Sequence, residues 1–502
     1  MKFKNYFSLL LSGTGSFATQ QQQHTSNILF SGHRYVKRKL DPIKLLSANT
    51  TSAFSHQNST DTTNIDSKEQ TPRALSSDEW DQMGEDILGE TYLDLSGKGL
   101  SISDNGSIVA IGAIDNDGTS NNIIDDQGHT RVYEYNGISW NKLGSDIDGE
   151  YPEDNYGFDV SLSGDGTTLA VSAPGHDRTT TPENIGRVQI FRFIGTDWVQ
   201  IGSDIFGESA GDLNGFSVSL SYNGNSIAIG APQSDISTKP GYARVYKFET
   251  SSSDWIQQGT TIMGEGNSDK CGSSVSLSSD GNFVAVGAPS NNPADEINAN
   301  SQSGHVRVHR FIGNDWSQLG QDIDGEGYYS DEFGSSVSLS SEGTVVAIGA
   351  PVSNDKGEVS VYAFDTSDTL WKKRGDDLVG TTYEDLFGHD VSISNDGNRL
   401  AIGSPGYGID VGRLDTYEWD DLNSTWASLK LPIIGDSNGD QFGTTVAMSG
   451  NGRRVAVGAI YHGKDTVEGS FPRYSGQVKV YEDSGKQYWM YQISFNHFFT
   501  TE

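Results

Sequence analysis

Residues 316–364 read WSQLGQDIDGEGYYSDEFGSSVSLSSEGTVVAIGAPVSNDKGEVSVYAF, and variants of this text follow one another along most of the 502-residue chain. A tryptophan marks the start of each copy, and successive markers lie 55–63 residues apart. A fixed period of this length indicates one supersecondary unit copied in series. Only Trp419 falls outside the register. Seven copies are bounded by eight tryptophans: Trp80, Trp140, Trp198, Trp255, Trp316, Trp371, Trp426 and Trp489.

Within a copy, two alternating runs flank a tight-turn signal. The runs Ser336-Val-Ser-Leu-Ser and Thr344-Val-Val-Ala-Ile-Gly alternate with period two. Gly343 between them supplies the positive φ that a hairpin turn requires. A third run begins at Val359, and the tryptophan segment provides a fourth. Each copy is therefore predicted to be a four-stranded antiparallel sheet.

Seven such sheets predict an all-β fold, a seven-bladed β-propeller over residues 76–495. One sheet cannot bury both of its faces alone, whereas a closed ring buries each sheet between two neighbours and removes most exposed edges. Eight tryptophan segments leave one surplus for seven blades. The segment after Trp80 is a full copy and the segment after Trp489 is not. We expect the Trp80 strand to close the ring beside the strand at Val478, with the reverse assignment open.

Residues 1–75 carry no repeat and are rich in Gln, Ser, Thr and Asn, which predicts a low-complexity, mostly disordered segment. Residues 1–18 fit a secretory signal, because Lys2 and Lys4 precede a short apolar stretch and Ala18 ends a cleavage-like site. An untargeted tail is the alternative. We therefore expect an extracellular or cell-surface protein, with a cytoplasmic one as the alternative. No apolar run reaches 18 residues, so no membrane span is predicted.

The chain is strongly acidic, with 67 Asp and Glu against 34 Lys and Arg and a net charge of −33. Residues 1–75 hold nine basic and four acidic side chains, which leaves 25 basic and 63 acidic ones and a net charge of −38 for residues 76–502. Such a ring repels phosphate backbones, so no nucleic-acid partner is expected. The charge favours cations and basic partners, and the alternative is that it serves solubility alone.

The sequence contains no metal-binding or phosphate-binding motif. His-Glu-x-x-His and the phosphate-binding Gly-x4-Gly-Lys-Ser/Thr are absent, and we predict no catalytic residue, cofactor or metal site. Cys271 is the only cysteine and stands where other copies have Phe333, which predicts a packing role rather than a reactive thiol. His309 occupies an aromatic position of the third run and is likewise predicted to pack.

The pair Phe333-Gly334 followed by Gly349-Ala-Pro351 resembles the FG-GAP repeat, the unit of the integrin alpha-subunit propeller and of many surface proteins. The resemblance covers about residues 76–490 and implies a propeller that binds a partner, without naming the partner. Several integrin-type repeats bind calcium through Asp-x-Asp-x-Asp-Gly at the first hairpin. The fourth copy here has Ser276, Ser278 and Asp280 at those positions, and one carboxylate disfavours calcium.

The loops that join strands two to three and four to one open on the same rim of the predicted ring. The two-to-three loops vary in length, and variable loops on a repeated scaffold usually carry recognition. The four-to-one loops are acidic, and an Asp recurs two residues before the Phe-Gly position in every copy. One interpretation makes each Asp a brace for its own loop. The ligand-rim candidates are Glu90, Asp94, Glu150, Asp154, Glu208, Asp212, Glu265, Asp269, Glu326, Asp331, Asp385, Asp436 and Asp440.

The leading functional expectation is a non-enzymatic binding or adhesion module, monomeric, that recognises a protein or glycan through this rim. An acidic structural or matrix protein that binds cations weakly and diffusely is the second hypothesis. An enzyme whose site lies in the central channel, without a recognisable motif, is the third.

Overall fold

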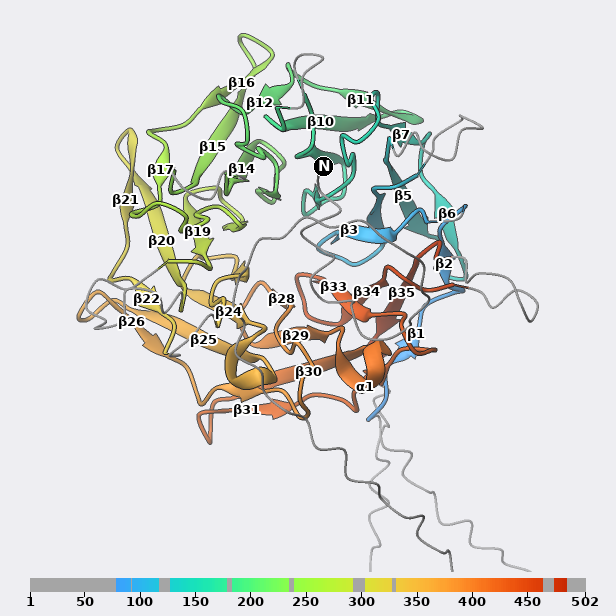
Figure 1. Cartoon of the computed structure of the whole chain (residues 1–502), viewed down its shortest axis with the longest axis vertical. Helices are drawn as coiled ribbons and strands as arrows, with labels where there is room; N and C mark the ends of the chain where they lie inside the picture. The colour runs from blue at the N-terminus through green and yellow to red at the C-terminus, as the bar shows by residue number, and fades with distance from the viewer. Residues whose placement is uncertain are drawn as a thin grey trace, which may run out of the picture. The chain divides into compact units, whose positions relative to one another are not determined.

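The computed structural model describes residues 78–91, 93–116, 127–177, 183–233, 239–291, 303–326, 331–463 and 474–484. In this part of the chain, seven antiparallel sheets follow one another around a ring (Figure 1). The predicted seven-bladed β-propeller is therefore confirmed. The expectations for residues 1–75, including the signal at residues 1–18, and for Trp489 concern residues outside the described ranges.

Blade 5 is the sheet formed by the sequence quoted first. Its strands are β23 (Ser336–Leu339), β24 (Val345–Ala350), β25 (Glu358–Asp365) and β26 (Leu370–Lys373), which pair in that order. A two-residue strand, β27 (Leu378–Val379), continues the pairing along β25. The innermost strand is β23 and the outermost is β26, as the alternating runs and the tryptophan segment predict.

The other complete blades repeat this plan. Blade 1 contains β3 (Ser96–Ile102), β4 (Ile108–Ala113), β5 (His129–Tyr135), β6 (Trp140–Lys142) and β7 (Ile147–Asp148). Blade 2 contains β8 (Val160–Leu162), β9 (Thr168–Ala173), β10 (Arg187–Ile194), β11 (Asp197–Gln200) and β12 (Ile205–Phe206). Blade 3 contains β13 (Ser217–Leu220), β14 (Ser226–Ala231), β15 (Tyr242–Glu249), β16 (Asp254–Gln257) and β17 (Ile262–Met263).

Blade 4 contains β18 (Ser274–Leu277), β19 (Phe283–Ala288), β20 (His305–Ile312), β21 (Asp315–Gln318) and β22 (Ile323–Asp324). Blade 6 contains β28 (Asp390–Ile393), β29 (Arg399–Ser404), β30 (Arg413–Asp420), β31 (Thr425–Ser428) and β32 (Ile433–Ile434). The helical segments described are one turn each, η3 (Ser353–Asp355) and α1 (Tyr407–Asp410). Among the described residues, no helix is long and apolar enough to cross a membrane.

Blade 7 joins the two ends of the repeat region. Its inner strands β33 (Phe442–Met448), β34 (Arg454–Ala459) and β35 (Gln477–Glu482) come from the last copy. Its outer strands β1 (Asp81–Gln82) and β2 (Ile87–Leu88) come from the segment after Trp80 and pair with β35, Gln82 opposite Tyr481 and Ile87 opposite Val478. The predicted closure by the Trp80 segment is confirmed.

The repeated tryptophans connect neighbouring blades. The indole of Trp371 in blade 5 is 3% exposed, and its N–H donates to the carbonyl of Leu319 in blade 4 at 2.7 Å. Five further blades repeat this bond to the blade before them. Trp80 in blade 7 donates instead to the Thr416 hydroxyl of blade 6 at 3.2 Å. A period of one tryptophan per blade therefore follows from one inter-blade link per blade.

Close approach of the backbones of neighbouring blades explains why glycine recurs at the Phe-Gly and Gly-Ala-Pro positions. A Cβ on Gly349 of blade 5 would lie 2.1 Å from the carbonyl oxygen of Gly388 in blade 6. Gly388 itself has a φ of +86°. Only glycine satisfies both requirements without displacing backbone.

The hydrophobic core is divided among the interfaces between blades. One cluster combines Val306 and Val308 of blade 4 with Val346 and Ile348 of blade 5. Cys271 is 5% exposed and belongs to the equivalent cluster between blades 3 and 4, so its packing role is confirmed. Burial raises the pKa of the Cys271 thiol to about 12, which leaves it protonated at neutral pH.

Candidate functional site

The hairpin end of the central channel is closed by backbone hydrogen bonds. One residue beside each inner hairpin donates its N–H to the equivalent carbonyl of the next blade, at 2.8–3.1 Å, until the chain of bonds returns to its start. The spacing between hydrogen-bonded strands is about 4.8 Å, so a seven-membered ring is about 11 Å across between backbone centres. The ring comprises Asp104, Gly164, Tyr222, Ser279, Ser341, Asn395 and Gly450.

A layer of serine hydroxyls follows along the channel, between this ring of backbone hydrogen bonds and the loop rim at the opposite end. Ser338 of β23 accepts a hydrogen bond from the N–H of Ile393 in the next blade at 3.0 Å. Six blades make this bond, and Ala447 occupies the position in blade 7. These serines lie on the innermost strands of the blades. Their hydroxyls join the blades, which is a structural use.

Two residues nearer the rim, the same kind of inter-blade bond is made by a serine in some blades and an aspartate in others. The hydroxyls of Ser217 and Ser336 accept from neighbouring backbone N–H groups at 3.2 and 3.1 Å. In blade 2 the carboxylate of Asp159 accepts from Val218 at 2.7 Å. In blade 6 that of Asp390 accepts from Val446 at 2.7 Å. Since a hydroxyl suffices for the link, the two carboxyl groups add a chemistry that the fold does not require.

Asp159 and Asp390 are titratable near neutral pH. Burial raises the pKa of Asp159 to about 7 and that of Asp390 to about 6, against hydrogen bonds from backbone N–H groups that lower both. The charge of Asp390 contributes to the raised pKa of Asp159. Blades 2 and 6 thus bring their carboxyl groups close enough to interact across the channel.

Lys98 of blade 1 lies beside these two carboxyl groups. Its amine is 4.6 Å from the centre of the Phe158 ring, and Phe158 in turn lies 5.0 Å from the Phe216 ring. Burial lowers the pKa of Lys98, and the charges of Asp159 and Asp390 act in the opposite direction. A β-bulge between Ser96 and Gly99 interrupts the pairing of β3 with β4 at this residue. Bulges next to active sites often serve to redirect a side chain.

His389 completes the cluster from blade 6. Burial lowers its pKa to about 4, and its Nδ1 lies 3.1 Å from the carbonyl oxygen of Thr444. The imidazole is therefore neutral at pH 7. The channel cluster, defined as Lys98, Phe158, Asp159, His389 and Asp390, contains an amine, a neutral imidazole and two carboxyl groups with pKa values near neutrality. Such groups can donate and accept protons in one place.

The channel cluster was not predicted from the sequence. Its signal lies in the two residues that follow the Phe-Gly position of each copy. These read Ser-Ser in blades 4 and 5, but Phe-Asp in blade 2, His-Asp in blade 6 and Lys-Gly in blade 1. A departure from the repeat on the inner strand was the available signal.

The recurring rim aspartates brace their own loops. Asp385 is 2% exposed, and its carboxylate accepts hydrogen bonds from the N–H groups of Thr381 and Thr382 at 2.8 and 2.6 Å. The bracing interpretation is confirmed in five blades, for Asp94, Asp212, Asp269, Asp385 and Asp440.

The two remaining rim aspartates differ. Asp154 is 3% exposed and lies 2.8 Å from Nδ1 of His176, a residue of the two-to-three loop. Asp331 is 8% exposed, and burial raises its pKa. The two-to-three and four-to-one loops therefore do meet on one rim.

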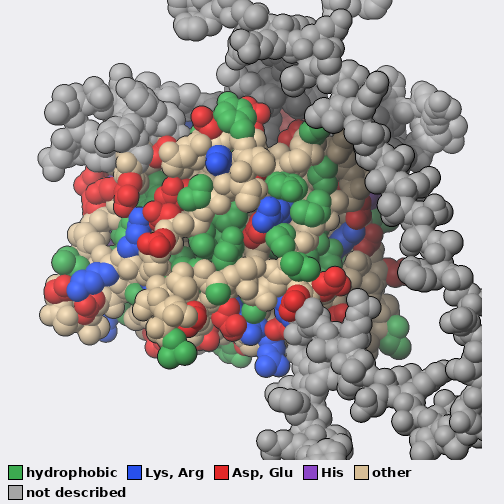
Figure 2. Space-filling view, turned by 90° about the horizontal axis from the view of Figure 1, so that it is seen from below, with side chains coloured by type: hydrophobic (Ala, Val, Ile, Leu, Met, Phe, Trp, Pro, Cys, Tyr) green, Lys and Arg blue, Asp and Glu red, His purple; other side chains and the backbone are tan. Residues whose placement is uncertain are grey.

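The exposed acids of the four-to-one loops pair with cations of the third strands. Glu90 lies 2.5 Å from Arg131, and Glu265 pairs with Arg307. On the face drawn in Figure 2, acidic side chains likewise lie beside basic ones. Each of these exposed loop acids therefore has a cationic partner. The other pairs are Glu150 with Arg187, Glu208 with Arg244, Glu326 with Lys373 and Asp436 with Lys479.

Blade 6 differs from the other blades in both members of this pair. It has Thr381 in place of the loop Glu, and its Arg413 pairs instead with the buried Asp415 at 2.5 Å. Arg413 Nε, Asp415 Oδ2 and Ser404 Oγ have no hydrogen-bond partner among the described residues. They line a cavity of about 10 Å³, the size of a single water site.

Among the described residues, one group of three side chains has the spacing of metal ligands, and an arginine of the third strand lies between them. Glu265, His305 and Asp322 offer ligand atoms within 4.8 Å of one another. Arg307 lies among them, 2.9 Å from Asp322 and paired with Glu265. Its guanidinium supplies the positive charge that a cation would bring, so this triad is a poor metal site.

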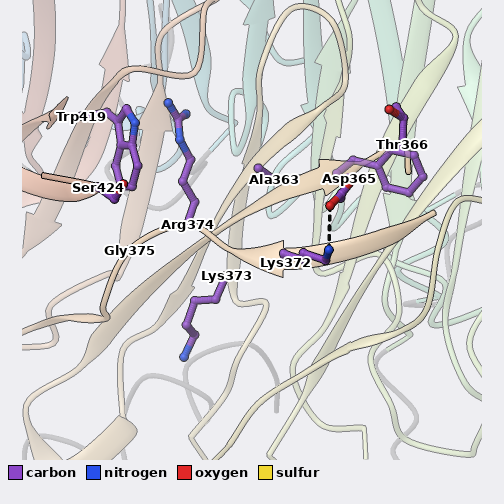
Figure 3. A pocket seen from close by; sticks show the side chains of 10 residues that line it. Ala363, Asp365, Thr366, Lys372, Lys373, Arg374, Gly375, Trp419 and Ser424 are labelled. Carbon is purple, nitrogen blue, oxygen red and sulfur yellow. Dashed lines mark hydrogen bonds and ion pairs between the residues drawn. The ribbon is translucent and has the colours of Figure 1, made fainter. Parts of the chain in front are cut away.

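A shallow pocket lies at the outer edge between blades 5 and 6 (Figure 3). Arg374 lies over the Trp419 ring at 4.6 Å and donates to the Gly397 carbonyl and the Asn398 side chain at 2.6 and 2.7 Å. Lys372 is paired with Asp365 at 2.6 Å. Because these cations already have partners, the pocket offers a ligand fewer polar groups than the channel cluster does.

Comparison with known proteins adds no family assignment. No family model matches the chain, and no curated protein matches it significantly. Solved structures with a similar fold include a protein of Bacteroides uniformis named as a 6-phosphogluconolactonase, with 11% identity, a TM-score of 0.48 and coverage of 68% of this chain and 87% of that one. Another is a periplasmic gluconolactonase of Pseudomonas aeruginosa, with 13% identity, a TM-score of 0.46 and the same coverages.

Both of these proteins are named as enzymes, which contradicts the expectation of a non-enzymatic binding or adhesion module. We therefore withdraw that expectation. At these identities and TM-scores the likeness concerns the propeller fold alone, and no substrate is carried over from it.

Proposed function

We propose that this propeller is an enzyme that performs general acid–base chemistry, hydrolysis or elimination, at the rim end of its central channel. The observation that supports it is the pair Asp159 and Asp390. Two carboxyl groups occupy positions at which a serine makes the same inter-blade link in other blades. A carboxyl group can exchange protons near neutral pH, and a hydroxyl cannot.

The two carboxyl groups have complementary roles. Because they interact and titrate near pH 6 and 7, one is protonated while the other is ionised over this range. The ionised group acts as the general base towards water or a substrate proton, and the protonated one acts as the general acid towards the leaving group. The Lys98 amine lies beside both, where its protonated form would stabilise developing negative charge.

Access to this site is from the rim. The ring of backbone hydrogen bonds closes the hairpin end of the channel. Substrate and product would both pass between the four-to-one and two-to-three loops. The paired charges of that rim would then set which substrates approach.

Substitution by serine gives a sharp test, since serine makes the inter-blade bond elsewhere in this protein. The full-length protein, Asp159→Ser and Asp390→Ser are assayed against aryl esters, sugar lactones and aryl glycosides. We expect each variant to fold and to lose about 10²- to 10⁴-fold in turnover. Ser217→Ala is the matched control, because it removes an inter-blade bond and leaves both carboxyl groups in place. Equal activity in the Asp variants and the wild type on an active substrate would refute the proposal.

We also propose that the repeats are of the FG-GAP type. The glycine of the Phe-Gly pair and the first glycine of Gly-Ala-Pro recur at corresponding positions of the copies. The contact of Gly349 with Gly388 across the blade interface gives a physical reason for that recurrence. An experimental structure in which Gly349 and Gly388 do not face each other across the blade interface would refute it.

A further inference from the structure

The Lys98 amine is unusual in lacking an ion pair beside two carboxyl groups. Among the described residues, no carboxylate oxygen lies within 4.0 Å of its nitrogen, although Asp159 and Asp390 are close enough to affect its pKa. Both carboxylates are held by backbone N–H groups of neighbouring strands. The amine rests on the Phe158 ring instead.

The position of Lys98 also departs from the repeat. Other copies have Phe, Ser, His or Thr at this place, directly after the Phe-Gly pair. The β-bulge of β3 lies at this residue, and Lys98 is half-buried. A lysine that forms no structural pair, at a bulge beside two proton-transferring groups, is placed for chemistry rather than for stability.

We propose that the Lys98 amine forms an imine with the carbonyl carbon of an aldehyde or ketone bound at the mouth of the channel. This inference rests on the proposed function, because the same two carboxyl groups carry the protons. It names the substrate class as small, uncharged carbonyl compounds.

The steps balance as follows. The nitrogen lone pair forms the C–N bond, and one amine proton moves to the carbonyl oxygen to give a carbinolamine. The protonated carboxyl group then donates to that hydroxyl, which leaves as water. The ionised carboxylate removes the remaining nitrogen proton to give the neutral imine. The pair therefore ends with the same number of protons, and no oxidant or reductant is needed.

The environment favours this reaction over anion binding. Burial lowers the pKa of Lys98, which increases the fraction of neutral, nucleophilic amine. Two neighbouring carboxyl groups would repel a carboxylate or phosphate ligand. An anionic ligand that pairs with the protonated Lys98 is therefore disfavoured. An uncharged carbonyl compound instead lies beside an amine and two groups that can transfer protons.

Reductive trapping tests the proposal. The full-length protein is incubated with glycolaldehyde or hydroxyacetone and sodium cyanoborohydride, which adds hydride to an imine and fixes it as a secondary amine. Peptide mass mapping then measures the adduct at every lysine. We expect Lys98 to be labelled at least 10-fold faster than Lys142, whose side chain is 39% exposed and paired with Asp146. Pyruvate, an anionic carbonyl compound, should label Lys98 more slowly.

Variants separate the mechanism from simple exposure. Lys98→Arg should abolish the adduct at this position without altering the melting temperature by more than a few degrees. Asp159→Ser should slow trapping about 10-fold or more while leaving Lys98 in place. The rate of trapping at Lys98 in the wild type should reach half its maximum at a lower pH than the trapping of a free lysine amine, because burial lowers the pKa of Lys98.

The outcomes are distinguishable from those of the preceding proposal. Labelling spread evenly over exposed lysines would overturn the imine, and a rate at Lys98 unaffected by Asp159→Ser would overturn the role of the carboxyl groups in forming it. If carboxyl-dependent turnover of the ester, lactone or glycoside panel persists in that case, the acid–base proposal stands without it. Loss of both would overturn both.

Discussion

Asp212 shows how one rim carboxylate serves its loop. It is 1% exposed and accepts hydrogen bonds from the N–H groups of Glu208 and Ser209 and from the side chains of Gln233 and Tyr242. Asp212→Ala would leave these donors unpaired and should lower the free energy of unfolding by about 3 kcal/mol. Glu208→Ala is the control, because its side chain is 67% exposed and its pair with Arg244 should contribute less than about 1 kcal/mol. Chemical denaturation measures both, and similar losses would contradict the bracing role.

The channel carboxyl groups should give stability a particular pH dependence. The pKa of Asp159 is raised to about 7 and that of Asp390 to about 6, whereas both titrate near 4 in the unfolded chain. Between pH 4 and 7 the folded state therefore holds protons that the unfolded state has lost. Stability contributed by these groups must fall as pH rises through this window.

Melting curves at pH 5 and pH 8 measure this effect. The double variant with Asp159→Ser and Asp390→Ser removes both groups and keeps the hydroxyl link. We expect the drop in melting temperature from pH 5 to pH 8 to be smaller in the double variant by about 3 °C or more. Other groups titrate in both proteins, so the comparison isolates the pair. Parallel curves would show that the two pKa values are not raised.

At the scale of the element, the blade is well specified by sequence because its pattern has a simple physical cause. Alternation gives the strands, and Gly343 with its φ of +69° gives the hairpin. The tryptophan gives the link to the preceding blade. The rim cations were not predicted, because the paired residues lie far apart in sequence: Glu90 and Arg131 meet only when strand three returns to the loop.

Trp371 belongs to the repeated tryptophan positions and Trp419 does not, so the two allow a matched test of the inter-blade link. Trp371→Phe removes the bond to the Leu319 carbonyl at a side chain that is 3% exposed. It should cost about 2 kcal/mol through the unpaired carbonyl and the space left behind. Trp419→Phe removes a bond to the exposed Asp421 at a half-buried ring and should cost less than about 1 kcal/mol. Equal effects on denaturant midpoints would mean that the register has another cause.

At the scale of the whole molecule, the propeller could be predicted and its channel cluster could not. The repeat occurs seven times along the chain, so the pattern that predicts a blade stays recognisable even where one copy departs from it. Lys98 has no counterpart in the other copies, the aspartate occurs at its position in only two of them, as Asp159 and Asp390, and the three residues belong to three blades. Their meeting depends on the closure of the ring, which brings blade 6 near blades 1 and 2, and no spacing along the chain records that distance.

The net charge of −33 raises the question of whether calcium acts specifically. Five rim aspartates already accept loop hydrogen bonds, and the exposed loop acids have cationic partners. Calcium should therefore act by screening, and the melting temperature in millimolar calcium should match that in sodium at equal ionic strength within about 2 °C. A saturable rise reversed by a chelator, and lost in Asp331→Asn, would instead reveal a specific rim site.

Ring closure by β1 and β2 is tested by two shortened chains that differ only in residues 76–89. A chain that begins at residue 76 keeps Trp80 and both strands, so it should melt cooperatively within about 10 °C of the full-length protein. A chain that begins at residue 90 lacks β1 and β2 and leaves the outer edge of β35, Gln477–Glu482, without a partner strand. It also lacks the indole link from Trp80 to Thr416. We expect this second chain to aggregate or to melt at a much lower temperature, because blade 7 stabilises both of its neighbours. Similar melting temperatures for the two chains would show that the Trp80 segment is not the closing strand in solution.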